Sequence, residues 1–162
     1  MKRGNLHGIW LFQKYFVPLW SLSMACHLKS KSQNLLESAD FLHANQRYQV
    51  VPHCSYYACF QLLQYICKHT LGLDGKAIID MIKNTPKRKN TDEGSHGFTI
   101  NQTLRYIESQ SYDDYRDQSV NIFKLKKKRQ RADYENVEIV EKDSAEAIDL
   151  SKAIILVLDK YC

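Results

Sequence analysis

The chain has 162 residues, 44% of them hydrophobic, and a formal net charge of +5. This length corresponds to one domain, which can bury a core without metal or disulfide cross-links. Residues 1–23 contain three basic residues and no acidic residue, so the rest of the chain contains 20 basic and 18 acidic residues. A strong positive field can therefore come only from a local cluster of bases.

The five cysteines exclude a disulfide framework, because their number is odd and no Cys-x-x-Cys pair occurs. Cys54, Cys59 and Cys67 fall in one predicted helix and are expected to be buried free thiols. This usage indicates a reducing compartment, so a cytoplasmic location is expected. His27 and His53 have no partners at ligand spacing, so neither a metal site nor a cofactor is expected.

Residues 1–31 are expected to form an N-terminal extension that is weakly structured or belongs to a mis-assigned start. The apolar stretch from Ile9 to Trp20 is interrupted by Lys14 and Pro18. It is therefore a poor signal peptide and too short for a membrane span, so no membrane association is expected. We favour Met24 as the natural start.

Hydrophobic periodicity over residues 32–162 predicts an all-α, up-and-down antiparallel bundle of about five helices. The central helix is expected from Pro52 to Leu71, because apolar residues occupy most of its sides and Gly72 follows as a helix-ending residue. Tyr56 and Tyr57 are interpreted as core residues of this helix. The residues expected to be buried are Tyr57, Leu62, Ile122 and Ile154.

Shorter elements follow this helix. Asp74 is expected to cap a short helix that ends at about Lys83, and a polar loop is expected at about residues 84–98. Thr99 is the expected cap of the next helix, which precedes the long helix.

The last two helices are expected at Asp114 to Ala132, opened by Asp113 or Asp114, and at Ser144 to Asp159. Asp143 with Glu146 three residues later resembles a capping box for the final helix. An extended connector is expected at 136–142.

The long helix carries a basic run, in which six of the eight residues from Lys124 to Arg131 are basic. On a helix, Ile122, Leu125, Arg129 and Ala132 share one face. Arg129 thus continues an apolar stripe and needs a partner, because its charge cannot stay buried and unpaired.

The basic run is a candidate contact for a phosphate backbone, with salt-dependent and sequence-tolerant attraction. A solvated helix face and a docking surface for an acidic protein are the alternatives. His96 is a further candidate, because it lies in the predicted polar loop and can either cap the next helix or reach Arg129. The candidate nucleic-acid-binding residues are Lys124, Lys126, Lys127, Lys128, Arg131 and His96.

Three motifs, in this order, resemble the HEPN superfamily, especially its small bacterial single-domain members. They are Ser55-Tyr-Tyr-Ala-Cys-Phe60, Arg129-Gln-Arg-Ala-Asp-Tyr134 and Ser144-Ala-Glu-Ala-Ile148. The resemblance covers roughly residues 35–160 and implies a helical bundle, a homodimer and an RNA or nucleotide ligand. It also implies the toxin-like role in a two-gene toxin–antitoxin module, with a nucleotidyltransferase-like antitoxin as partner.

HEPN ribonucleases carry an Arg-x(4–6)-His motif, and the resemblance assigns its arginine to Arg129. Tyr134 stands five residues later, where histidine is expected. With a pKa of about 10, tyrosine is a poor general base at pH 7. We therefore expect RNA or nucleotide binding, with a metal-independent ribonuclease and a non-catalytic dimeric interaction module as alternatives. The candidate catalytic residues are Arg129, Asp133 and Tyr134, and Asp133 is also a candidate to neutralise Arg129 or Arg131.

Overall fold

The computed structural model describes residues 19–84 and 94–162, and of residues 19–26 it describes the backbone alone. Within these ranges the regular elements are all helical, which confirms the predicted all-α class. There are six α-helices here, with short 3-10 or π turns beside some of them. They are α1 (Leu19–Ala44), α2 (Val51–Tyr65), α3 (Gly75–Asn84), α4 (Ser95–Gln110), α5 (Tyr112–Tyr134) and α6 (Glu141–Leu158).

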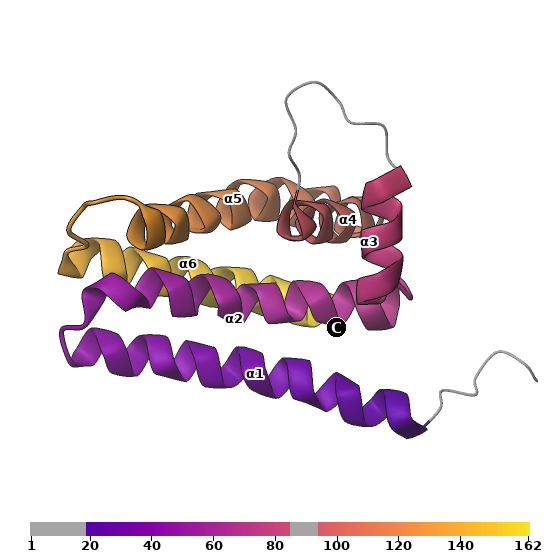
Figure 1. Cartoon of the computed structure of the whole chain (residues 1–162), viewed down its shortest axis with the longest axis horizontal. Coiled ribbons are helices and arrows are strands. Elements are labelled where there is room, and N and C mark those ends of the chain that lie inside the picture. Colours follow the sequence, from indigo (N-terminus) through magenta and orange to yellow (C-terminus); the bar gives the residue numbers. More distant parts are fainter. Residues whose placement is uncertain (1–18, 85–93) are drawn as a thin grey trace, which may run out of the picture.

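The central position belongs to α2, which contacts α1, α4, α5 and α6. In Figure 1, α1 and α2 lie side by side as an antiparallel hairpin, and α5 lies on the other side of α2 from α1. Apolar residues on most sides of α2 explain this position, because each side is buried against a different helix. The main core joins Leu62 and Leu63 of α2 to Ile122 and Leu125 of α5 and to Ile154 of α6.

The first helix begins at Leu19, earlier than the predicted domain start at residue 32. Ser32 is buried, Lys29 Nζ donates to the backbone oxygen of Cys162 at 3.5 Å, and the same ammonium lies 4.5 Å from the centre of the Tyr65 ring. Lys29 thus contacts the rest of the bundle, and α1 runs across the predicted boundary at residue 31, which stays a prediction. Residues 1–18 lie outside the described residues, and Met24 as a start stays a prediction.

Two predicted caps of the middle helices have different outcomes. Asp74 Oδ1 accepts the backbone N–H of Ala77 at 2.7 Å, which confirms the cap of α3. Thr99 does not cap α4, because the helix already begins at Ser95 after Gly94 and Thr99 is buried inside it. The predicted polar loop at about residues 84–98 therefore ends earlier, before Ser95. Its residues 85–93 lie outside the described residues.

The predicted starts of the last two helices are also corrected. Ser111, not Asp113 or Asp114, caps α5, since its Oγ accepts the Asp114 backbone N–H at 3.3 Å. Helix α6 begins at Glu141 without a side-chain cap, so Asp143 and Glu146 form no capping box.

Three of the four residues expected to be buried are buried, namely Leu62, Ile122 and Ile154. Tyr57 is only half-buried, because its hydroxyl serves a polar contact described below. A search of the described part of the chain finds no helix with the length and apolar character needed to cross a bilayer.

Candidate functional site

Arg129 lies near the end of α5, and its side chain is only 14% exposed. Its Nη2 donates to the Tyr57 hydroxyl at 3.1 Å. The guanidinium carbon lies 5.8, 5.4 and 5.0 Å from the ring centres of Tyr56, Tyr57 and Tyr134. We call these three rings the aromatic collar. Cation–aromatic contacts at such distances are stabilising. The collar and the Tyr57 hydroxyl are two of the partners that the sequence predicted an inward arginine to need.

Asp133 is the third partner. Its Oδ2 lies 2.7 Å from Arg129 Nε, one helical turn away. Nε is buried and this carboxylate oxygen is its neighbour, so the contact is a close charge pair inside the site. Asp133 therefore neutralises Arg129, while Arg131 has a different acid, Asp143, at 3.7 Å.

Burial lowers the pKa of Arg129, but a hydrogen bond with Tyr134 and the electrostatic influence of Tyr57 and Asp133 outweigh this effect. The pKa of Arg129 is consequently raised, and the guanidinium stays charged at any physiological pH.

His53, on α2, also contacts Asp133, and the sequence interpretation missed it. Its Nδ1 lies 3.1 Å from Asp133 Oδ2 and 3.3 Å from Oδ1, and its ring centre lies 4.6 Å from that of Tyr57. Because Nδ1 faces a carboxylate, we assign the ring hydrogen to Nδ1, which leaves Nε2 as an acceptor when the ring is neutral. The side chain is 44% exposed, so a ligand can reach the ring.

His96, in the first turn of α4, lies on the other side of the collar. Its Nδ1 is 3.0 Å from the Tyr56 hydroxyl, and its ring stacks on Phe60 with centres 4.0 Å apart. Burial, followed by the charges of Arg129 and Lys126, lowers the pKa of His96, so the ring is neutral at pH 7.

Burial also raises the pKa of Tyr56, which keeps its phenol protonated. The phenol therefore donates to Nδ1 of His96, and the hydrogen of the neutral ring lies on Nε2.

Three of the six candidate nucleic-acid-binding residues pair with acids of α6. Lys124, Lys128 and Arg131 are spaced i, i+4 and i+7 and so share one face of α5. Glu146 pairs with both lysines, at 3.5 Å from Lys124 and more closely with Lys128. Asp143 lies 3.7 Å from Lys128 and 3.7 Å from Arg131. The two acids that were expected to cap α6 thus neutralise bases of α5.

Lys126 and Lys127 have no ion pair among the residues that the structure describes. Lys126 is half-buried and close enough to His96 to act on its pKa, whereas Lys127 is exposed on the outer side of α5. Of the sequence-predicted residues, the structure thus gathers Arg129, Asp133, Tyr134 and His96 around the collar, with Lys126 nearby. The residues directed to α6 instead are Lys124, Lys128 and Arg131.

The charged guanidinium of Arg129 can bind an anion, with the rings of His53 and His96 nearby. The described residues contain no group of three or more His, Cys, Asp or Glu side chains that could hold a metal ion. Comparison with known proteins finds no matching family model, no matching curated protein and no matching solved structure.

Proposed function

We propose that this chain is a HEPN-like protein that binds RNA or a nucleotide through a phosphate at Arg129. The observation that carries the proposal is the guanidinium fixed between three phenol rings and one carboxylate, on a side chain that keeps 14% of its surface exposed. An arginine that packing already orders loses little side-chain entropy when it binds an anion. Phosphate oxygens also form strong charge-assisted hydrogen bonds with a guanidinium.

The surroundings of Arg129 favour single-stranded RNA or a nucleotide. Tyr134 is 73% exposed and its ring centre lies 5.0 Å from the guanidinium carbon, so it offers a face on which a base can stack. Lys126 and Lys127 extend positive charge along α5. A phosphate on the guanidinium and a base on the phenol is a combination that suits a ribonucleotide unit.

Fluorescence anisotropy with a labelled single-stranded RNA of about twelve nucleotides tests this proposal. Arg129→Ala should weaken binding at least about tenfold, because a charged hydrogen-bonded contact is lost. Lys127→Ala should weaken it about threefold and reduce the salt slope by about one. Lys152→Ala is the matched control, since Lys152 pairs with Asp40 between α6 and α1. Equal small effects from all three changes would contradict the proposal.

A second candidate function is a metal-independent ribonuclease, and the His53–Asp133 contact favours it. The proton-transfer residue missing after Arg129 would come from α2. Nε2 of His53 would accept the proton of an RNA 2′-hydroxyl, whose oxygen attacks the adjacent phosphorus while Arg129 stabilises the added charge. The 5′-oxygen leaves with a proton from water, and the products are a 2′,3′-cyclic phosphate and a 5′-hydroxyl.

RNA cleavage in the presence of EDTA tests this second candidate. His53→Gln should abolish cleavage and retain RNA binding within about twofold, since His53 is a proton-transfer residue here and not the anion site. RNA binding without any cleavage by the unchanged protein would reject the ribonuclease and leave the binding function intact.

The proposal includes a homodimer formed by the outer face of α5. Val120, Phe123, Lys127 and Tyr134 are spaced i, i+3, i+7 and i+14, so they share this face, and the three apolar ones are exposed. A nucleotidyltransferase-like antitoxin would reach the exposed Tyr134 from the same side, with this chain as the toxin-like component of the module. A purely non-catalytic interaction module would dimerise in the same way but fail the RNA-binding test.

A further inference from the structure

A separate pocket lies at the other end of the bundle. In Figure 1, α3 crosses one end, while the last turns of α5, with Arg129, lie at the other. The pocket has a volume of about 440 Å³, which is within the range of small-molecule sites, about 300–1,000 Å³. We infer that it binds a small amphipathic anion, a carboxylate on an acyl or aryl body. This inference is independent of the proposed function.

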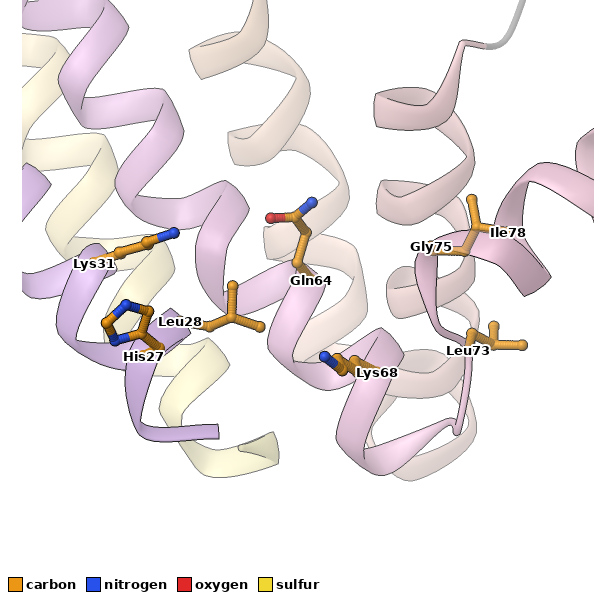
Figure 2. Close-up of a pocket in the computed structure, with 8 residues that line it drawn as sticks. All are labelled: His27, Leu28, Lys31, Gln64, Lys68, Leu73, Gly75 and Ile78. Carbon is orange, nitrogen blue, oxygen red and sulfur yellow. The ribbon is translucent and has the colours of Figure 1, made fainter. Parts of the chain in front are cut away.

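The pocket has three sides of different origin (Figure 2). His27, Leu28 and Lys31 come from α1, Gln64 and Lys68 lie between, and Leu73, Gly75 and Ile78 form the opposite side at α3. Three aliphatic side chains from two sides supply an apolar wall for the body of a ligand, namely Leu28, Leu73 and Ile78.

The polar groups of the lining select an anion. Lys31 and Lys68 carry charge in the pocket, and the described residues of the lining include no carboxylate. The first residue of α3, Gly75, brings the positive end of a helix to the same space. The nearest acid in sequence, Asp74, has its Oδ1 engaged by the Ala77 backbone N–H at 2.7 Å. A lining that combines two lysines with aliphatic side chains matches a molecule with a negative head and an apolar body.

The backbone beneath the pocket has an unusual form. Residues Ile66–Thr70 continue α2 as a π-helical turn, in which the Leu71 backbone N–H donates to the Ile66 carbonyl at 3.0 Å. Such turns are rare and occur frequently at functional sites. This turn carries Lys68 into the pocket from between α1 and α3.

Isothermal titration calorimetry with sodium decanoate tests the inference on the full chain. Decanoate should bind at one site, whereas acetate, which has only the head, and decyltrimethylammonium, which has the opposite charge, should bind at least about tenfold more weakly. Lys31→Gln and Lys68→Gln should each weaken decanoate binding about threefold, since the lysines are partly solvated. Absence of decanoate binding, or equal binding of the cation, would overturn the inference.

Gly75→Phe supplies a steric test that does not depend on charge. A Cβ built at Gly75 meets no heavy atom within 4 Å, so the fold can accept a large side chain at this position of the lining. This variant should lose decanoate binding, while Ile79→Phe, at an exposed position of the same helix, should keep it. Unchanged decanoate binding by the Gly75 variant would overturn the location of the site, and Arg129→Ala should leave decanoate binding unchanged.

Discussion

Asp133→Asn separates the two roles that the structure gives to this carboxylate. Asp133 Oδ2 lies 2.7 Å from Arg129 Nε and 3.1 Å from His53 Nδ1, and the side chains of Asp133 and Arg129 are 19% and 14% exposed. Asparagine keeps the shape and removes the charge. Breaking a fully buried pair costs about 3–5 kcal/mol and an exposed pair at most about 1, so a loss of about 2 kcal/mol in the free energy of unfolding is expected.

The same change should strengthen RNA binding, because the carboxylate competes with the phosphate for Arg129. Removing one negative charge next to a bound phosphate should contribute about 1 kcal/mol in a partly solvated site, which is about fivefold in Kd. The gain should shrink as salt rises, since screening weakens the repulsion that was removed.

Urea denaturation and fluorescence anisotropy at low salt measure the two effects separately. Asp143→Asn is the matched control, because Asp143 pairs with Lys128 and Arg131 but not with Arg129. The Asp143 variant should lose less stability than the Asp133 variant, and its RNA affinity at low salt should rise by less. Weaker RNA binding by the Asp133 variant would refute the competition, since the carboxylate would then help to bind the ligand.

Three further changes test single contacts. Tyr57→Phe removes the hydroxyl that accepts a hydrogen bond from Arg129 at 3.1 Å, and urea denaturation should show a loss of about 1 kcal/mol. Burial, Arg129 and Lys126 lower the pKa of His96 in the folded protein. The neutral His96 ring therefore stabilises the fold fully above the unfolded pKa of about 6.5, and this stabilisation is lost as pH falls through the pKa of the folded state. Lys126→Gln should therefore raise the His96 pKa in an NMR titration, and no upward shift would contradict the proximity of the two groups. Phe123→Glu should convert the expected dimer to a monomer in light scattering, and a monomeric unchanged protein would reject the dimer.

The helices were predictable because their apolar residues repeat with the helical period. Leu62, Ile122 and Ile154 are buried for this reason. Caps were less predictable, because a cap motif describes only neighbours in sequence. Asp143 and Glu146 fit a capping box, yet the bases of α5 attract both carboxylates across the bundle.

The candidate site was predictable only in part. Arg129 interrupts an apolar stripe, which is a local signal that it needs a partner, and Asp133 stands one turn away. His53 is 80 residues from Asp133, and Tyr57 is 72 residues from Arg129, so no linear pattern links them. The one available signal was that His53 and Tyr57 are spaced i and i+4, and therefore project from the same face of α2.

The most direct measurement of the central claim follows the arginine Nε–H signals by NMR during titration with a short single-stranded RNA. Arg129 Nε lies 2.7 Å from Asp133 Oδ2 in the free protein, and a phosphate on the guanidinium should change this surrounding, so the Nε–H signal should shift and saturate as the RNA binds. Arg116, which pairs with Asp113 and Asp117 near the start of α5, is the internal reference and should stay unchanged. An unmoved Arg129 signal, or equal shifts at Arg129 and Arg116, would contradict a phosphate site at Arg129.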